Sequence, residues 1–511
     1  MNTTYRTFLL AGVAFAVLGT PAMAQSRRVA DTAAPPPVQA LPPQPDPRVT
    51  LLEQQLRDVR AEIDNLKKSQ ADTDSTAALA DLKRATGAQY VDINNQLAAL
   101  PKVGLDNGRL TVASADGRFT LALRALIQFD SGYFAQGRNP ASVDLNSGAN
   151  FRRAQIGVTG TAWKDWSYNL TLDFGGNGLE NSGYLYTAYL EYDGFKPFGI
   201  RAGAYAPPAG IEDATGSADL LFLERPASAD IARNIAGSPS RTAVTLFAQD
   251  TDYLIAASLT GDKANVGSTT KLNTAPFDEQ LAFVGRASWL AVNTPEFKWL
   301  LDADLTHVFK PADNVAGSVP STTVLNAVSF SNGPELAVDS FKTVNTGNID
   351  AKTVTEYGFE TAAEYDALYA QGGYFRYDIT RRNTAIVSPN FSGWYALVTY
   401  SLTGETHAYD PTTASFRGLR PLTGLGSGGW GAWELKARYS SIDLDYNPLT
   451  STATGGIGGG IQDVWSAGVN WYPTNGVRFS LEYDNIKVNH VNAPTTDISS
   501  DAIGLRTQLS L

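Results

Sequence analysis

The sequence predicts an all-β fold: a transmembrane antiparallel β-barrel of about sixteen strands, preceded by a short N-terminal coiled-coil helix. Three observations lead to this prediction. Many segments alternate apolar and polar residues, which is typical of strands. After the N-terminus, no segment approaches the roughly 18 uncharged apolar residues of a membrane-spanning helix. Short and long connections also alternate along the chain, as they do in bacterial outer-membrane barrels.

Residues 1–24 are expected to be a secretory signal peptide, because Arg6 precedes an apolar run and Ala22-Met23-Ala24 forms a small-x-small cleavage pattern. A short membrane anchor is the alternative, but the apolar run is too short to span a bilayer. Residues 25–47 contain seven prolines and predict an extended linker.

Residues 48–100 predict a periplasmic helical segment with apolar residues spaced three and four apart. The main repeat consists of Val49, Leu52, Leu56, Val59, Ile63 and Leu66, and a weaker one of Tyr90, Ile93, Leu97 and Leu100. The main repeat predicts a coiled coil, and one amphipathic helix packed on a globular body is the alternative. Three heptads are short, so the coil would form only with help from an attached oligomer.

Residues 105–511 are expected to form the barrel. The clearest strand pair runs from Phe151 to Phe174, where only Lys164 and Asp165 link two alternating arms. Each arm has about the length of a tilted membrane-crossing strand, roughly 9–11 residues. Trp163 and Trp166 beside the turn suit an interfacial aromatic girdle. Soluble sheets alternate as well, so this hairpin alone leaves the membrane assignment open.

Further alternating runs bring the predicted number of strands to about sixteen. Besides the two arms of the hairpin, they lie at 119–134, 185–192, 198–206, 241–249, 252–260, 280–290, 297–308, 354–364, 368–378, 393–402, 431–443, 462–472, 477–488 and 501–511. One connection, 403–430, breaks the alternation, because it is long but falls on the side of the short turns. A dropped or merged strand there would change the number.

The composition argues against several classes of function. The chain has no Cys, which excludes disulfides and thiolate metal sites, and its formal charge of −11 argues against a nucleic-acid binder. His307, His407 and His490 match no metal-ligand spacing. Residues 424–428 are glycine-rich but lack the strand and helix of a phosphate-binding loop. We therefore expect no enzyme, no catalytic residues, no cofactor and no metal.

Charges on the non-lipid face of the strands are the candidate functional residues. A charge that faces lipid costs roughly 2–4 kcal/mol at the midplane, so these side chains should point into a lumen. The pore-lining and anion-binding candidates are Arg124, Arg153, Arg201, Arg241, Arg286, Lys436, Arg438, Arg478 and Arg506. The inward acids Asp302, Asp304, Glu356 and Glu360 fall on strands roughly across the pore. A basic wall opposite an acidic wall would orient and sort solutes. Alternatively, these charges only pair with one another.

The connection 207–240 is the candidate constriction loop. It contains Leu220-Leu221-Phe222-Leu223, which is too apolar for an exposed loop tip and could pack on the inner wall. The charges that would then reach the constriction are Glu212, Asp213, Asp219, Glu224, Arg225, Asp230 and Arg233. An external interaction loop is the alternative.

Five stretches carry a family resemblance. They are FRRAQIGVTGTAWKDWSYNLTLDF, PPAGIEDATGSADLLFLERP, GWYALVTYSLTGE, GGWGAWELKARYSSIDL and VNWYPTNGVRFSLEYDN, in this order over most of 119–490. Through them the chain resembles the phosphate-selective porin O/P family of Gram-negative outer membranes. The resemblance implies a sixteen-stranded homotrimeric porin with a helical segment in the periplasm.

The expected function is therefore passive diffusion of small hydrophilic solutes, in particular anions such as phosphate or polyphosphate. Outer-membrane lipid and small anionic solutes would be the partners, and nucleic acid would not. The alternative is a structural protein that tethers the envelope, with the barrel as anchor and the coiled coil as cell-wall contact. Single-channel recording would separate the two, because an anchor should be silent.

Overall fold

The computed structural model describes residues 47–69, 76–106, 108–138, 140, 143–176, 183–235, 240–263, 280–314 and 325–511. The predicted signal peptide lies outside the described residues, and so does the predicted linker except for Pro47. Contacts divide the chain into a unit that ends at Asn94 and a unit from Asn95 to Leu511. No helix in the described part of the chain has the length and apolar character needed to cross a membrane.

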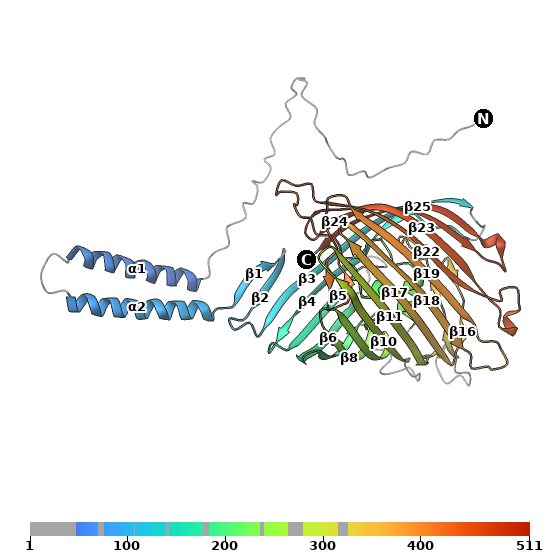
Figure 1. Cartoon of the computed structure of the whole chain (residues 1–511), viewed down its shortest axis with the longest axis horizontal. Coiled ribbons are helices and arrows are strands. Elements are labelled where there is room, and N and C mark those ends of the chain that lie inside the picture. Colours follow the sequence, from blue (N-terminus) through green and yellow to red (C-terminus); the bar gives the residue numbers. More distant parts are fainter. Residues whose placement is uncertain are drawn as a thin grey trace, which may run out of the picture. The chain divides into compact units, whose positions relative to one another are not determined.

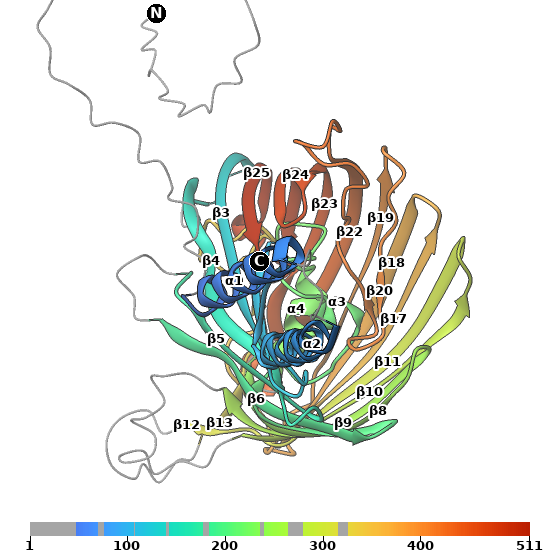
Figure 2. The same ribbon diagram turned by 90° about the vertical axis from the view of Figure 1, so that its left-hand side faces the viewer.

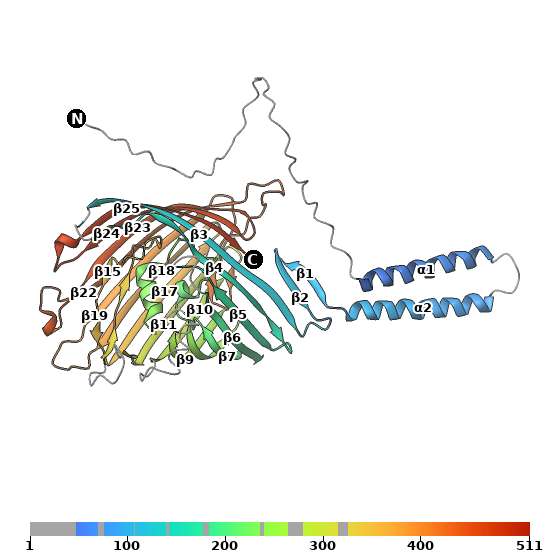
Figure 3. The same cartoon turned by 180° about the vertical axis from the view of Figure 1, so that it is seen from behind.

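The first unit contains two helices where the sequence predicted one short coiled coil. Helix α1 (Pro47–Ser69) and helix α2 (Thr76–Ala99) run antiparallel (Figures 1 and 3). On α1, the predicted seam residues Leu56, Val59 and Ile63 are half-buried. On α2, Tyr90 and Val91 remain more than half exposed.

The second unit is a closed antiparallel barrel of sixteen strands, which confirms the predicted fold class. Its strands follow the chain order, each pairs with the next, and the last pairs with the first. They are β3 (Thr120–Arg138), β4 (Gly148–Ala162), β5 (Trp166–Asp173), β6 (Tyr184–Phe195), β7 (Phe198–Tyr205), β8 (Arg241–Gln249), β9 (Tyr253–Lys263), β10 (Leu281–Asn293), β11 (Phe297–Lys310), β17 (Thr353–Tyr365), β18 (Leu368–Thr380), β19 (Asn390–Ser401), β22 (Ala432–Tyr446), β23 (Ile457–Thr474), β24 (Val477–Asn489) and β25 (Ile498–Ser510).

The connection 403–430 contributes no strand to the barrel, so the predicted number of strands stands. It holds only the small pair β20 (Tyr409–Asp410) and β21 (Ser415–Phe416). An additional hairpin precedes the barrel, which the sequence did not predict. Its strands, β1 (Lys102–Asp106) and β2 (Arg109–Ala113), pair with each other, and β2 pairs with the start of β3.

The two faces of each strand differ as membrane burial requires. On β22, Trp433 and Leu435 are 37% and 44% exposed on the outer face, whereas Glu434, Lys436 and Arg438 on the opposite face are buried. Aromatic residues such as Trp163, Phe195 and Tyr365 stand exposed beside the short turns, as in an interfacial girdle. The outer face is therefore apolar, and the inner face carries the charges.

Parts of three connections turn into the space inside the barrel. The first, between β7 and β8, carries α3 (Ile211–Ala214) and α4 (Ala227–Asn234), which lie within the ring of strands in Figure 2. The second, between β11 and β17, includes β12 (Asp313–Asn314), β13 (Leu325–Val328), β14 (Ser331–Asn332), β15 (Val344–Asn345) and β16 (Ile349–Asp350). The third is 403–430. Two short 3-10 helices, Thr452–Thr454 and Pro494–Thr496, lie in the remaining long connections.

Candidate functional site

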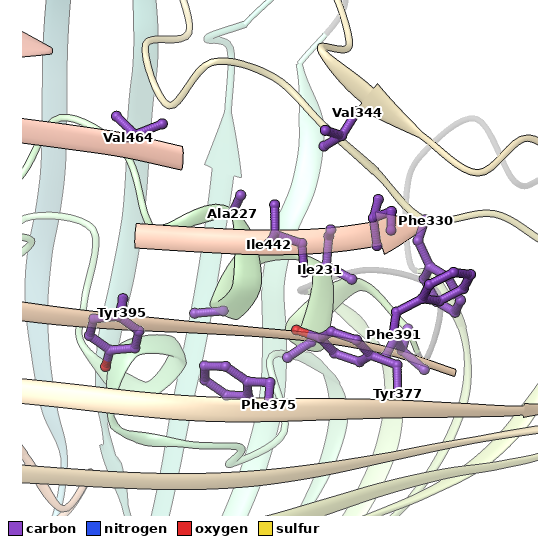
Figure 4. Close-up of a cluster of buried hydrophobic side chains, with 14 of the residues drawn as sticks. Ala227, Ile231, Phe330, Val344, Phe375, Tyr377, Phe391, Tyr395, Ile442 and Val464 are labelled. Carbon is purple, nitrogen blue, oxygen red and sulfur yellow. The ribbon is translucent and has the colours of Figure 1, made fainter. Parts of the chain in front are cut away.

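Helix α4 packs on an apolar patch of the inner barrel wall. Figure 4 shows Ala227 and Ile231 of this helix beside Phe375, Tyr377 and Ile442 of the barrel strands. The Tyr377 hydroxyl also donates a hydrogen bond of 2.6 Å to the carbonyl oxygen of Ser228. Burial of aromatic and aliphatic surface therefore fixes α4 against the wall.

The predicted apolar run of the same connection is also buried. Leu220, Phe222 and Leu223 are only 1–3% exposed. The backbone N–H of Leu223 donates to Glu482 of β24 at 3.1 Å. An external loop tip would not bury these side chains, so the connection between β7 and β8 lies inside the barrel.

Basic side chains of the wall hold this connection through its carbonyl oxygens. Arg478 donates to Leu220 at 2.5 Å, Lys436 to Leu221 at 3.0 Å and Arg438 to Glu224 at 2.7 Å. The guanidinium of Arg438 also lies 4.4 Å from the ring centroid of Phe222. These three predicted pore-lining residues thus anchor backbone inside the lumen.

Glu224 is the acidic centre of this contact. Arg152 Nε lies 2.5 Å from its carboxylate, and Arg506, which mainly binds Asp130 at 2.6 Å, lies 3.4 Å from it. Burial opposes the charged form, but Arg152 and Arg153 hold the pKa of Glu224 well below its ordinary value.

The sequence did not predict Arg152 as a site residue, because strict alternation assigns it to the lipid face. A register shift in the pairing of β3 with β4 places Gln128 opposite Arg153 and Phe129 opposite Phe151. Arg152 is the additional residue of this bulge, and a β-bulge re-aims side chains. A bulge leaves no reliable mark in the sequence, apart here from the adjacent Arg152 and Arg153.

The predicted acidic wall lies on β11 and β17. Asp302, Asp304, Glu356 and Glu360 are all at least nine-tenths buried. Glu360 accepts hydrogen bonds from the backbone N–H groups of Ile211 and Glu212 in the inward connection. In the order of strands, this wall is separated from the basic residues of β22, β24 and β25 by β18 and β19.

The second inward connection adds an acid that the sequence did not single out. Glu335 binds Arg438 Nη2 at 2.7 Å and the backbone N–H of Ala227 at 2.7 Å. Burial raises the pKa of Glu335, and Arg438 opposes that rise. Glu335 therefore joins two connections and the basic wall.

The third inward connection, 403–430, enters from the rim of the short turns. Arg286 of β10 donates to the carbonyl oxygens of Thr413 and Ala414 at 2.7 and 2.8 Å. The His407 ring contacts Glu434 of β22 at 2.9 Å, and its backbone N–H donates to Glu364 of β17. Gly418 N–H donates to Asp219 at 3.1 Å, so this connection also contacts the first one.

The remaining predicted pore-lining residues are dispersed over the inner wall. Arg153 donates to Gln128 at 2.8 Å, and Arg201 pairs with Glu191 at 2.5 Å. Arg241 donates to the carbonyl oxygen of Arg233 at 3.1 Å. Arg124 is exposed and forms no ion pair with any described residue.

Most of the predicted constriction-loop charges bind other parts of the inward connections. Asp213 pairs with Arg233 at 2.6 Å, and Asp230 accepts from Asn332 at 3.0 Å. Arg225 turns back on its own connection, donating to the carbonyl oxygens of Glu212 and Thr215. Glu212 accepts from Gln371 of β18 at 2.9 Å, and burial raises its pKa.

A polar cavity of about 530 Å³ lies between the first and third inward connections and the barrel wall. Its lining includes Arg109, Arg124, Arg417, Arg420 and Arg478. The only acidic side chains in that lining are Asp219 and Asp410, and Asp410 is paired with Arg417 at 2.6 Å. Arginines therefore outnumber aspartates in the lining of this cavity.

A closed barrel with an apolar outer face and a charged, narrowed lumen defines the class of protein as an outer-membrane porin. Residues 121–511 match the model of a protein family described as "Phosphate-selective porin O and P". The chain belongs to this family, which confirms the resemblance and places the protein in the Gram-negative outer membrane.

Relatives of known sequence agree with this assignment. Porin O of Pseudomonas aeruginosa is 26% identical over 78% of this chain and 90% of its own length. An uncharacterized protein of Caulobacter vibrioides is 26% identical over 70% of this chain and 66% of its own length.

Solved structures with similar barrels have lower sequence identity to this chain than these relatives do. OmpT of Vibrio cholerae matches with a TM-score of 0.46 at 10% identity, covering 77% of this chain and 98% of that one. The anion-selective porin from Comamonas acidovorans matches with a TM-score of 0.43 at 10% identity, covering 77% and 100%.

Proposed function

We propose that this porin conducts small hydrophilic anions by passive diffusion, with phosphate or polyphosphate as the solutes best suited to it. The observation that carries the proposal is the polar cavity, where five arginines face two aspartates. Membership of a phosphate-selective porin family supports it.

The chemistry of arginine favours anions of this kind. The guanidinium group stays charged at every physiological pH, and its fork of N–H donors matches phosphate oxygens. Fixed charge in a narrow passage acts over roughly 8–10 Å at physiological salt. Anions would therefore concentrate in the cavity, and cations would be repelled from it.

We further propose that the connection 207–240 forms the constriction, and that the arginine wall acts mainly by holding it in place. The hydrogen bonds from Arg478, Lys436 and Arg438 to carbonyl oxygens of this connection support such an anchoring role. The nine predicted basic residues would then serve two purposes, because most of them anchor backbone while Arg124 faces solute directly.

The assembly and domain layout are also proposals. A homotrimer in outer-membrane lipid, with the helical segment 48–100 in the periplasm after removal of residues 1–24, fits the family. A solved form of Vibrio cholerae OmpT is described as a trimer. Chemical cross-linking of the purified porin should yield a trimer, and a monomer alone would refute this part.

The test of anion conduction is the reversal potential of single channels across a KCl gradient. The parent protein should prefer chloride, and Arg124→Glu should shift the reversal potential toward cations, most strongly at low salt where screening is weak. Arg376→Glu is the matched control, because Arg376 is an exposed barrel residue paired with Asp378. If the Arg124 variant kept the ion preference of the parent at low salt, the role of the cavity would be refuted.

A further inference from the structure

A cluster of buried carboxylates on the acidic wall has an arrangement that its hydrogen bonds do not explain. One oxygen from each of Asp302, Asp304 and Glu360 lies within 4.8 Å of the others. In the register of β11 and β17, Asp302 stands opposite Glu360 and Asp304 opposite Gly358. A Cβ at Gly358 would lie only 2.1 Å from Asp304 Oδ1, so this carboxylate occupies the space above the glycine.

Some oxygens of the cluster have partners. Asp302 Oδ2 accepts from Arg286 at 2.8 Å and from the Ser288 hydroxyl. Glu360 accepts from two backbone N–H groups of the first inward connection and from the Tyr395 hydroxyl. These bonds orient the two carboxylates on one side of the cluster.

Other oxygens of these carboxylates lack a hydrogen-bond partner among the described residues. Asp302 Oδ1, Asp304 Oδ1 and both oxygens of Glu356 are buried and accept no hydrogen bond of ordinary length and angle from any described residue, although Asp304 and Thr306 lie close to Glu356. Glu356 is fully buried. An unpartnered buried carboxylate is costly, and such groups in proteins are usually paired or coordinate metals.

A small cavity adjoins Asp304 and Glu356. It measures about 10 Å³ and is lined by Asp304, Glu356 and Glu360 together with residues of the first inward connection. A space of this size holds about one water molecule or one ion. Glu356, with two unpartnered oxygens, therefore lines a space that a single ion could fill.

Nearby cations leave an excess of negative charge. Arg233 also lines the small cavity, but it is paired with Asp213 at 2.6 Å. Arg241 interacts electrostatically with Glu356, but the two side chains do not form an ion pair. Asp304, Glu356 and Glu360 together carry three negative charges when ionised, so Arg241 can balance at most one.

We propose that Asp302, Asp304, Glu356 and Glu360 bind one divalent cation, and that Ca²⁺ fits them best. Hard cations prefer carboxylate oxygens, and Ca²⁺–oxygen distances are roughly 2.3–2.6 Å. Oxygens on opposite sides of such an ion are roughly 4.6–5.2 Å apart. One ion could therefore reach the oxygens of Asp302, Asp304 and Glu360, which all lie within 4.8 Å of one another. Through Glu360 the ion would tie the first inward connection to the acidic wall.

Terbium luminescence on the full-length porin in detergent provides a direct test. Tb³⁺ occupies calcium sites, and Tyr395, hydrogen-bonded to Glu360, lies close enough to sensitise its emission. We expect saturable emission that Ca²⁺ displaces. Asp304→Asn and Glu356→Gln should each weaken Tb³⁺ binding by at least about tenfold, in line with loss of one charged ligand.

Asp484→Asn is the matched control, because Asp484 on β24 is also fully buried with two unpartnered oxygens but lies outside the cluster. This variant should bind Tb³⁺ as the parent does. Circular dichroism in the β-region shows whether each variant is folded. Folded parent protein without saturable emission, or emission that both cluster variants retain, would overturn the proposal. Protons shared among the carboxyl groups would then account for the unpartnered oxygens.

Discussion

The basic and acidic walls of the lumen follow the same alternation of side chains but satisfy their charges differently. Lys436, Arg438 and Arg478 donate to carbonyl oxygens of the first inward connection. Asp304 on β11 and Glu356 on β17 keep oxygens that accept no hydrogen bond from any described residue, whereas Arg438 and Arg478 each leave only Nε without a partner. A guanidinium or ammonium group can bind any neutral carbonyl, whereas a carboxylate needs a donor, and helices and strands use most backbone N–H groups themselves.

This difference explains how the lumen is built. Inward connections bring many free carbonyl oxygens, so they bind best to the basic wall. Among the described residues, Glu360 accepts from the N–H groups of Ile211 and Glu212 at the start of α3, and Glu364 of β17 accepts from that of His407. Asp304 and Glu356 of the acidic wall, like Asp484 of β24, are consequently carboxylates at which a cation or a proton is needed.

The largest effect is expected from Arg438→Met, which removes the cation that joins two connections to the basic wall. Glu335 would be left buried without its ion pair. Loss of one partner of a buried pair costs roughly 3–5 kcal/mol. Urea unfolding of the barrel in micelles should show a drop of this size, and single-channel conductance should rise as the first connection loosens.

Arg376→Ala serves as the control for this prediction, because its pair with Asp378 is 48% and 42% exposed. Removing an exposed pair costs only about 0–1 kcal/mol. Equal losses of stability in the two variants would contradict the view that the basic wall anchors the lumen.

The sequence predicted the barrel well because the membrane imposes a strong contrast between two faces. All nine predicted basic residues lie on the inner-face parity, and Arg124 shows the expected exposure to a cavity. Their partners were not predictable, since they belong to connections whose path depends on tertiary packing. Alternation also assigned Arg152 to the wrong face of β4, because a β-bulge there shifts which residues point inward. The anomalous length of 403–430 was visible, but nothing in its sequence showed that it turns inward.

An intermediate effect is expected at His407, which connects the two walls. Its ring Nε2 lies 2.9 Å from the Glu434 carboxylate. Its ring Nδ1 donates a hydrogen bond of 2.7 Å to the Arg417 carbonyl oxygen, because a carbonyl oxygen only accepts. Tyr369 packs on the ring, and Glu364 accepts the backbone N–H. Burial opposes protonation, but Glu434 and Glu364 raise the pKa of His407 above its ordinary value near 6.5.

A raised pKa fixes the sign of the pH dependence. Protonated His407 stabilises the fold fully below the ordinary pKa, and this contribution is lost as pH rises through the higher folded-state pKa. His407→Gln should lower the free energy of unfolding by roughly 1.5–3 kcal/mol at low pH, the value of a hydrogen bond to a charged group. Urea unfolding between about pH 6 and about pH 9 measures this. If the difference in the free energy of unfolding between parent and variant did not shrink with rising pH, His407 would not be protonated in the folded protein.

The smallest effect, opposite in sign, is expected from Glu356→Gln in the presence of a chelator. Neutralising one of several like charges relieves repulsion, worth roughly 1 kcal/mol for unit charges 4 Å apart even in water. The variant barrel should therefore unfold at higher urea concentration than the parent. Adding Ca²⁺ should reverse the order, since only the parent keeps the full set of ligands. A destabilised variant in chelator would mean that Glu356 has a stabilising partner, and the contrast between the two walls would then fail.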